Sequence, residues 1–417
     1  MVEVWIPYGE VEVPVRLSDE NLAWLADPGT AGGERGIEAA KLALQSPEGA
    51  KSLREIVKPN SKVAVALNGP PSRTDASALL RLVLEEASSA GAAPGEVEVI
   101  VAAGTQLEGG GELASLEPLL KGGRLAVSDP REGEFAEVGV TSFGTKVQLN
   151  KSFVDADARI AVGELRANWF YGLNGPWSAV LGICSQATIE QNGKLALKKD
   201  AKRQRGLQNN VHLDSREAES MANVDLSLAV AAGRGGAVLD AFAGSPEKVH
   251  ERSVDVARKL YAFEAASKVD ILLVGSGGLP FDSTLSSACE AAFNFEEAVE
   301  KGGRIVLVAE CRDGPGSGAF LDMFYRFKEA GAALGEVRKN FSFEGYKAAK
   351  LLELRERHGV SIVSSMPAYF AEKVFAFRTA DTANEGLQNA FRFLGRGSRI
   401  GVAVDGSSSV VVAAEVA

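Results

Sequence analysis

The stretch KVAVALNGPPSRTDASALLRLVLEEASSAGAAPGEVEVIVAAG, residues 62–104, decides the fold class of this chain. Residues 62–67 form an apolar run with the length of a buried strand, and residues 75–90 have the spacing of an amphipathic helix. Residues 96–102 form a second apolar strand, which ends at a glycine. This order predicts a parallel βαβ unit, whose ligands bind beyond the carboxyl ends of the strands.

The same alternation of strands and helices continues along the chain. Residues 124–128 and 159–163 extend the first series of predicted strands. A second series follows, with strands at 270–274, 303–309 and 399–404 and a helix over 284–301. We therefore predict an α/β fold of two α/β domains, with mainly parallel sheets and a cleft between them. The predicted domains are residues 1–265 and 266–417, and the C-terminal tail could pack back on the first domain.

The bulk composition argues against several classes of function. The chain has 417 residues, a formal net charge of −10 and 46% hydrophobic residues. Nucleic acids and anionic membrane surfaces attract basic patches, so neither is an expected partner. No apolar run approaches the roughly 20 residues that span a bilayer. The first residues alternate like a strand and lack the profile of a signal peptide.

The three cysteines, Cys184, Cys289 and Cys311, are far apart in the sequence and odd in number. This pattern predicts neither a disulfide framework nor a zinc site. We expect reduced cysteines and a cytoplasmic location.

Four segments carry a resemblance to a known family. They are LNGPPSRTD at 67–75, AAGTQ at 102–106, VGELRANWFYGLNGPWSAVLG at 162–182 and VGSGGLPFDSTLSSACEAA at 274–292. In order and spacing they resemble the nickel-pincer lactate racemases, a family of 2-hydroxy-acid racemases and epimerases. The resemblance extends over most of the chain.

The resemblance implies a pyridinium-derived cofactor tethered through a lysine, with nickel held additionally by a histidine, and two further histidines that exchange the hydroxyl proton. Here Gln106 and Asn168 stand at the positions of those two histidines, and Ser178 stands at the tethering lysine. The metal-ligating histidine is absent near residues 192–194. In the second domain the family's tyrosine, glutamine and lysine are replaced by Ser286, Ser287 and Glu290, while Arg73, Thr105 and Asp282 are retained.

These replacements change the chemistry that the site can perform. A general base must titrate near the working pH, whereas the amides of Gln106 and Asn168 do not titrate. A serine cannot form the lysine linkage, and no nearby histidine offers nickel a nitrogen ligand. We therefore predict no metal site and no cofactor, so that nickel-pincer binding is not expected.

A small anionic molecule is the expected ligand of the altered site. Arg73 and Arg166 are predicted to hold a carboxylate, because arginine binds this group in a bidentate manner. The predicted catalytic residues are Gln106, Asn168 and Glu290, and the predicted substrate-binding residues are Arg73, Thr105, Arg166, Trp169, Ser178, Asp282, Ser286 and Ser287.

Simpler structural roles compete with several of these assignments. A solvated helix face is favoured over an acid/base role for Glu290, and capping of the helix that follows is favoured for Asp282. Arg166 has Glu164 as an alternative partner, and Trp169, with Phe170, Tyr171 and Trp177, forms either an aromatic wall for a ligand or plain loop packing.

Three histidines remain, and none is predicted to replace the lost catalysts. His212 is expected to cap a helix or to be solvated. His250 is expected to make a structural hydrogen bond. His358 lies near the end of a charged helix, where an imidazolium would complement the helix dipole.

The sequence therefore predicts a divergent lactate-racemase-like protein that binds and acts on a small 2-hydroxy acid or sugar acid without the standard nickel-pincer hydride chemistry. One alternative is a true 2-hydroxy-acid racemase or epimerase that holds the cofactor through unusual ligands. A second alternative is a non-catalytic binding or partner subunit. A homo-oligomer and pairing with another family member are both open.

Overall fold

A computed structural model of the chain describes residues 1–27, 35–69, 72–102, 116–120, 122–198 and 207–412. It divides into two compact units. The central unit consists of Gly29–Arg166 and Phe170–Leu260. The terminal unit consists of Met1–Pro28, Ala167–Trp169 and Tyr261–Ala417.

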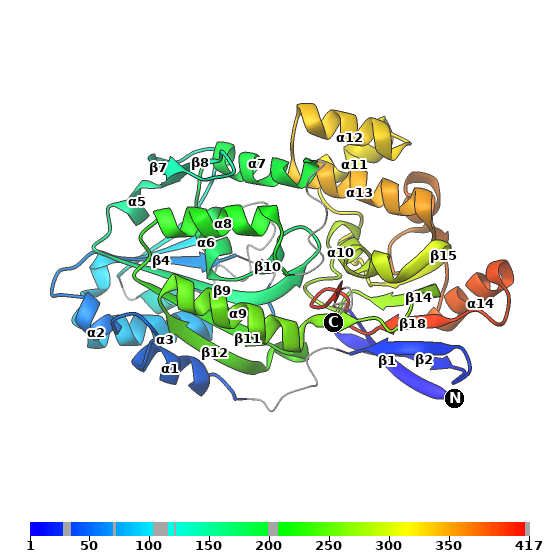
Figure 1. The fold of residues 1–417 in the computed structure, drawn as a ribbon, viewed down its shortest axis with the longest axis horizontal. Helices are drawn as coiled ribbons and strands as arrows, with labels where there is room; N and C mark the ends of the chain where they lie inside the picture. Colours follow the sequence, from blue (N-terminus) through cyan, green and yellow to red (C-terminus); the bar gives the residue numbers. More distant parts are fainter. Residues whose placement is uncertain (28–34, 70–71, 103–115, 121, 199–206, 413–417) are drawn as a thin grey trace. The chain divides into compact units, whose positions relative to one another are not determined.

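The central unit is built on a mainly parallel sheet, which in the described residues has seven strands in the order β12-β11-β9-β4-β5-β6, with β10 paired to β9 (Figure 1). The pairs β11–β9, β9–β4, β4–β5 and β5–β6 are parallel, and the edge pair β11–β12 is antiparallel. A separate antiparallel hairpin consists of β7 and β8. The strands are β4 (Val63–Asn68), β5 (Val97–Ala102), β6 (Arg124–Val127), β7 (Phe135–Val140), β8 (Lys146–Asn150), β9 (Ala158–Asn168), β10 (Gly172–Asn174), β11 (Leu226–Ala232) and β12 (Val238–Gly244).

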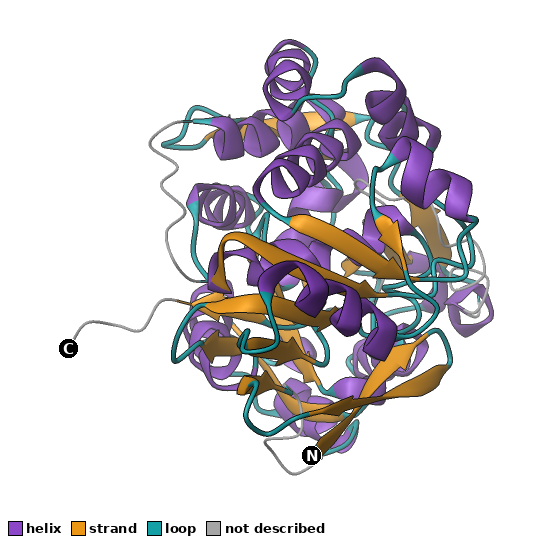
Figure 2. Cartoon of the chain, turned by 90° about the vertical axis from the view of Figure 1, so that its right-hand side faces the viewer, coloured by secondary structure: helices purple, strands orange, loops and turns teal. Residues whose placement is uncertain are grey.

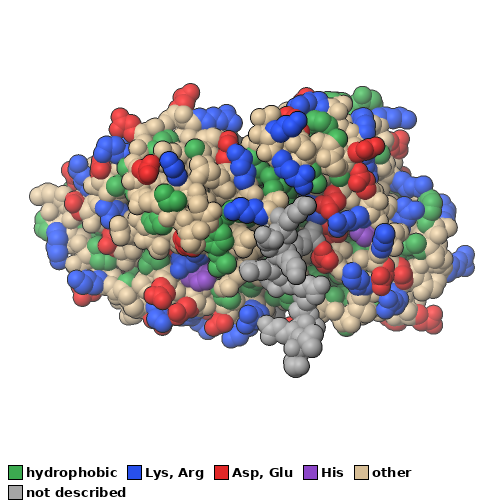
Figure 3. Space-filling model, turned by 45° about the horizontal axis from the view of Figure 1, so that its top comes forward, with side chains coloured by type: hydrophobic (Ala, Val, Ile, Leu, Met, Phe, Trp, Pro, Cys, Tyr) green, Lys and Arg blue, Asp and Glu red, His purple; other side chains and the backbone are tan. Residues whose placement is uncertain are grey.

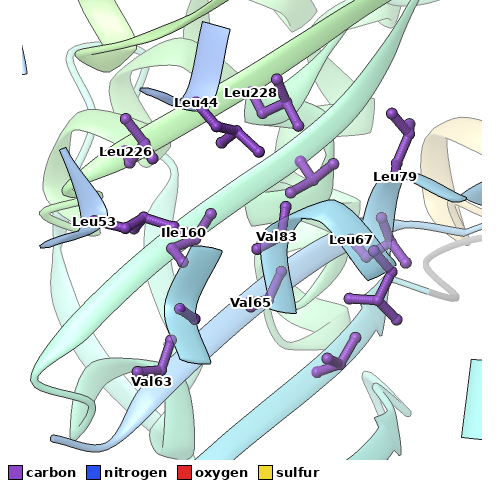
Figure 4. Close-up of a cluster of buried hydrophobic side chains, with 14 of the residues drawn as sticks. Leu44, Leu53, Val63, Val65, Leu67, Leu79, Val83, Ile160, Leu226 and Leu228 are labelled. Atoms are coloured by element: carbon purple, nitrogen blue, oxygen red, sulfur yellow. The ribbon is translucent and has the colours of Figure 1, made fainter. Parts of the chain in front are cut away.

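Both faces of this sheet are apolar, because successive side chains of a strand point to opposite faces and strands such as β4 are apolar at consecutive positions. On one face Val63, Val65 and Leu67 of β4 join a cluster that also contains side chains of α1, α2 and α3 (Figure 4). On the other face Ala64 and Ala66 join a cluster with side chains of α5 to α8. The helices are α1 (Glu38–Gln45), α2 (Leu53–Ile56), α3 (Ala76–Ser89), α5 (Lys151–Val154), α6 (Pro176–Gly182), α7 (Gln186–Lys194), α8 (Asn210–Met221) and α9 (Pro246–Leu260).

The terminal unit contains a second, all-parallel sheet of six described strands in the order β17-β16-β15-β14-β18-β3. Strands β1 and β2 form an antiparallel hairpin, and β13 pairs with β19. In Figure 2, helices flank the strands of these sheets. The strands are β1 (Val2–Tyr8), β2 (Val11–Leu17), β3 (Leu22–Ala26), β13 (Ala262–Glu264), β14 (Val269–Gly275), β15 (Val299–Val308), β16 (Gly359–Val363), β17 (Arg378–Thr379), β18 (Ile400–Ala403) and β19 (Val410–Val412).

Helices α10, α13 and α14 of the terminal unit pack on its parallel sheet, and α11 and α12 pack on α13. Helix α14 buries its apolar side against β14, β15 and β16, and Leu387 belongs to the core cluster there. A short π-helix, Phe370–Val374, lies between β16 and β17. The α-helices are α10 (Leu285–Phe295), α11 (Gly318–Arg326), α12 (Ala330–Lys339), α13 (Phe343–Arg357) and α14 (Ala383–Leu394).

The predicted α/β class with mainly parallel sheets is confirmed, but the predicted domain boundary differs from the observed division. The main change of unit falls at Tyr261, and the first 28 residues belong with the C-terminal half. The reason is long-range pairing: β3 pairs with β18, and Val4 and Ile6 of β1 enter the same core as β14 and β15. The tail strand β19 likewise pairs within the terminal unit.

Most predicted elements lie within a few residues of their observed bounds, with two larger differences. The strand predicted over 159–163 extends to Asn168 in β9. The helix predicted over 284–301 ends at Phe295, and the following strand begins at Val299 instead of 303. A 3-10 turn, Glu296–Ala298, separates the two elements. The apolar residues of this stretch are compatible with either structure, so their pattern did not locate the end of the helix.

On the face shown in Figure 3, Lys and Arg side chains are interspersed with Asp and Glu side chains. No helix in the described part of the chain combines the length and the apolarity that crossing a membrane requires.

Candidate functional site

In the central unit, the carboxylate of Glu164 accepts hydrogen bonds from residues 72–74, the segment that contains Arg73. Glu164 of β9 accepts hydrogen bonds at Oε2 from the backbone N–H of Arg73 at 3.0 Å and of Thr74 at 2.6 Å. The same oxygen accepts from the hydroxyls of Ser72 at 2.8 Å and Thr74 at 2.6 Å. Gly236 lets a second segment approach, since a Cβ there would lie 2.5 Å from the Arg73 carbonyl. Residues 72–74, which follow β4, are therefore held by Glu164, the residue that the sequence offered as a partner for Arg166.

Replacing Glu164 with glutamine is expected to lower the free energy of unfolding by about 1–3 kcal/mol, because a neutral amide is a weaker acceptor for these partly buried donors. Urea unfolding measures the loss. Glu98→Gln on β5 of the same sheet is the control, because Glu98 pairs with the exposed Arg124, at 3.3 Å. Equal losses in the two variants would show that Glu164 does not anchor the loop.

Ser178 occupies a capping position in the first turn of α6. Its Oγ accepts from the backbone N–H of Gly175 at 3.4 Å and donates to Oδ1 of Asn174 at 3.3 Å. Gly163 allows this helix start to contact β9, since a Cβ there would lie 2.5 Å from the Gly175 carbonyl carbon. The position that resembles the tethering lysine thus holds a short side chain that is engaged in the helix start.

Two histidines form a buried pair beside α6. His212 Nδ1 lies 2.9 Å from the carbonyl oxygen of Leu173, and the Nε2 atoms of His212 and His250 are 2.8 Å apart. A carbonyl only accepts, so Nδ1 of His212 carries a proton, its Nε2 is the acceptor, and Nε2–H of His250 is the donor. Both imidazole rings meet the indole of Trp177 edge-on, with 5.2 Å between the ring centroids in each pair.

The environment keeps both imidazoles neutral. Burial lowers the pKa of His212 to about 4, with a further contribution from Arg216. Burial, Arg216 and His212 lower the pKa of His250 to about 3. The structural hydrogen bond expected for His250 is confirmed, whereas the capping or solvated role of His212 is wrong: the residue is fully buried, and Asn209 caps α8.

The remaining polar groups near the expected nickel ligand are engaged in hydrogen bonds. Asn192 of α7 donates through Nδ2 to the Val211 carbonyl at 2.9 Å and to Oδ2 of Asp214 at 2.8 Å. The same carboxylate oxygen accepts from Thr145 at 2.9 Å. Among the described residues there is no group of three or more His, Cys, Asp or Glu side chains that could hold a metal ion. The described donors therefore do not fit a nickel-pincer group.

In the terminal unit, five polar side chains form one connected group, the Lys347 cluster. Lys347 Nζ lies 3.0 Å from Oε1 of Glu290 and 3.4 Å from Oε1 of Glu344. Asn168 donates to Oε2 of Glu290 at 3.0 Å, and Ser286 donates to Oε2 of Glu344 at 2.7 Å. Helices α10 and α13 and the end of β9 thus bring together three predicted site residues and two that were not predicted.

The burial of this cluster corrects one expectation. Glu290 is only 8% exposed and does not lie on a solvated helix face. Lys347 is fully buried; burial opposes its charge, but Glu290 and Glu344 outweigh that effect and raise its pKa. In the sequence Lys347 is one of several charged residues of a helical segment, and no local pattern distinguishes it from a surface lysine.

Trp169 lies beside this cluster and contacts aromatic residues of the terminal unit. Its ring stacks on that of Tyr346, with 5.6 Å between the ring centroids and 21° between the ring planes. It meets the ring of Phe293 edge-on, with 4.8 Å between the centroids. Phe170, Tyr171 and Trp177 belong instead to the central unit. The four aromatic residues of this segment therefore divide between the two units.

Asp282 joins three segments of the terminal unit. Its Oδ2 accepts from the backbone N–H of Gly9 at 2.8 Å and of Glu310 at 3.1 Å, and burial raises its pKa. Thr284, not Asp282, caps α10 by accepting from the Ser287 N–H at 3.2 Å, and it also donates to the Ser287 hydroxyl. The capping role considered for Asp282 is therefore wrong.

The other predicted residues are placed as follows. Arg73 and Arg166 belong to the central unit, and each has an interaction partner. Thr105 and Gln106 lie outside the described residues. All three cysteines are free and buried, and burial raises the pKa of each thiol. At the C-terminal end of α13, burial lowers the pKa of His358, so the imidazolium expected there is not favoured.

Comparisons with known proteins agree with this architecture. The model of the lactate racemase N-terminal domain matches residues 8–205, and that of the lactate racemase C-terminal domain matches residues 264–412. A protein named lactate racemase from Thermoanaerobacterium thermosaccharolyticum is 26% identical over 427 residues, which covers 99% of each chain. Another of that name, from Lactiplantibacillus plantarum, is 23% identical over 429 residues, covering 99% of this chain and 100% of the relative.

Solved structures show the same fold. The lactate racemase apoprotein of Thermoanaerobacterium thermosaccharolyticum superimposes with a TM-score of 0.85 at 24% identity, covering 98% of this chain and 100% of that one. A protein from Thermotoga maritima superimposes with a TM-score of 0.66 at 14% identity, covering 92% of this chain and 100% of that one. At these identities the likeness concerns the fold.

Proposed function

We propose that this chain, which belongs to the lactate racemase family, binds and acts on a small 2-hydroxy acid or sugar acid without the standard nickel-pincer hydride chemistry. Lactate is itself a 2-hydroxy acid, and the two relatives with that activity in their names align over almost the whole chain. We therefore infer the substrate class from the family, and the change of chemistry from the substituted residues.

The observation that carries the proposal is the engagement of the polar groups around α6. Ser178 caps the helix, and the two nearby histidines are neutral and hydrogen-bonded to each other. Both ring nitrogens of His212 already have partners, so neither is free to bind a metal or to act as a general base.

Under this proposal, Arg73 holds the carboxylate of the substrate in the central unit, and Arg166 assists. The Arg73 backbone is fixed by Glu164 at 3.0 Å, which limits the entropy lost when the side chain binds an anion. In the terminal unit, Glu290 accepts a hydrogen bond from Asn168 at 3.0 Å and is the residue that we assign as acid and base. An amide only donates and accepts hydrogen bonds, so proton transfer falls to the carboxylate of Glu290.

Binding of lactate tests the carboxylate role of Arg73. Each enantiomer is expected to raise the melting temperature of the wild-type protein at saturating concentration. Arg73→Ala is expected to weaken binding by about 10- to 100-fold, because it removes a charge-assisted hydrogen-bond pair. Arg81→Ala, at an exposed position of the following helix, is the matched control. Equal affinity in wild type and Arg73→Ala would refute the carboxylate role.

The first alternative, a racemase that holds nickel through unusual ligands, is favoured by the names of the two relatives. Production of the protein beside the enzymes that make the cofactor, followed by nickel analysis and absorption spectroscopy, separates the two. We expect no bound nickel, together with conversion of one hydroxy-acid isomer measured by chiral chromatography. Stoichiometric nickel would replace our proposal with this alternative. Absence of turnover together with a co-purifying family member would favour the partner-subunit alternative.

A further inference from the structure

The Lys347 cluster carries an excess of negative charge. Two carboxylates, Glu290 and Glu344, share one ammonium group, so their formal charges sum to −1. All three groups also act electrostatically on the buried Cys289. In a buried setting, a further carboxylate at this place would be repelled strongly. The cluster is therefore unsuited to the acidic end of a substrate.

The same cluster is suited to hydroxyl groups. Each carboxylate oxygen can accept two hydrogen bonds, and Oε2 of Glu290 accepts one from Asn168. Ser286 donates its proton to Glu344, so its oxygen is an acceptor toward any ligand. A ligand hydroxyl donates to such acceptors in charge-assisted hydrogen bonds.

An aromatic platform adjoins these acceptors. Trp169 follows Asn168 directly, and its ring stacks on Tyr346, which is adjacent to Lys347 in α13. Both rings are partly exposed. An aromatic face beside hydrogen-bonding carboxylates can receive the C–H groups of a polyhydroxylated chain while its hydroxyls are bound.

We infer that the Lys347 cluster and the Trp169–Tyr346 pair form a hydroxyl-recognising subsite, which selects a polyhydroxylated acid of the sugar-acid class over a short acid such as lactate. The inference rests on the proposed function, because it names the class of 2-hydroxy acid that this chain binds. The terminal unit binds the hydroxylated tail of the acid through the acceptors of Glu290 and Ser286 and the ring of Trp169.

Three acids with the same 2-hydroxy-carboxylate group test this inference by calorimetric titration. Gluconate has hydroxyls along a six-carbon chain, 2-hydroxyhexanoate has the same chain length without the further hydroxyls, and lactate has almost no tail. We expect wild type to bind gluconate about tenfold more tightly than either of the others, because several additional hydrogen bonds form. Affinity for 2-hydroxyhexanoate equal to or higher than that for gluconate would overturn the inference.

Variants locate the selectivity. Glu290→Gln removes the excess charge and is expected to reduce the gluconate-to-hydroxyhexanoate affinity ratio about fivefold or more. Ser286→Ala, a smaller change, provides a second variant should Glu290→Gln not fold. Glu353→Gln, which alters a different ion pair of α13, should keep the wild-type ratio. An unchanged ratio in both test variants would refute the placement of the subsite.

The outcomes also separate this inference from the proposed function. Binding of lactate without preference for gluconate refutes the subsite alone. Failure of all three acids to bind refutes both the proposed function and the subsite.

Discussion

Lys347→Met is expected to lower the free energy of unfolding by about 3–5 kcal/mol, one of the two largest effects that the structure predicts. The side chain is fully buried, and its Nζ lies within 3.4 Å of two carboxylates. Methionine has a similar volume, so the main change is loss of the charge that compensates Glu290 and Glu344. Urea unfolding followed by tryptophan fluorescence measures the difference, because Trp169 lies beside this cluster.

Two comparisons make this prediction specific. Lys248→Met removes an exposed lysine that pairs with Glu251 at 2.8 Å, and it is expected to leave stability close to that of wild type. The double variant Lys347→Met/Glu290→Gln is expected to recover part of the lost stability, because one of the two uncompensated charges is removed with the lysine. A loss in Lys347→Met no larger than that in Lys248→Met would contradict the role of the buried ammonium group.

Stability is also expected to fall steeply in mild acid because of His212 and His250. Their pKa values in the folded protein are lowered to about 4 and about 3, with burial as the first cause. The unfolded chain has ordinary histidines and therefore binds more protons over this range. The stabilisation is complete above about pH 6.5 and is lost as the pH falls toward 4, by up to about 1.4 kcal/mol per pH unit for each histidine.

His250→Gln tests this prediction with the hydrogen bond preserved. The glutamine amide can donate to Nε2 of His212 but does not titrate, so the variant is expected to lose less stability than wild type between pH 7 and pH 4.5. Proton NMR provides a second measurement, because the chain has only three histidines. We expect neither member of the pair to titrate between pH 8 and pH 5. An identical pH dependence in wild type and variant, or titration of both rings near pH 6.5, would contradict the buried neutral pair.

The strands and helices of the sheet layers could be predicted from the sequence, because the apolar pattern that forms them is local. Val63, Val65 and Leu67 alternate with Ala64 and Ala66, and the two sets enter different cores on the two faces of one sheet. Strand β4 and helix α3 were therefore predicted to within a residue or two. The glycines and polar loops between such elements carried the family resemblance, since their spacing is equally local.

The candidate site was only partly predictable. Asn168 and Glu290, which come from different parts of the sequence, were both proposed as site residues, and they are hydrogen-bonded at 3.0 Å. Lys347 was missed, because a lysine in a charged helical segment is normally a surface residue. The pairing of His212 with His250 was also missed, because no local pattern indicates that two histidines so far apart in the sequence form a hydrogen bond.

The amino-acid sequence by itself determined the α/β class, the approximate course of its strands and the loss of the titrating groups that the family resemblance requires. Only the tertiary structure decided that β3 belongs to the C-terminal sheet, where it pairs with β18, and that Lys347 compensates Glu290. The physical reason is the range of the interactions. Hydrophobic periodicity acts between neighbouring residues and can be read along the chain, whereas strand order and buried ion pairs depend on which distant segments bury their surfaces together.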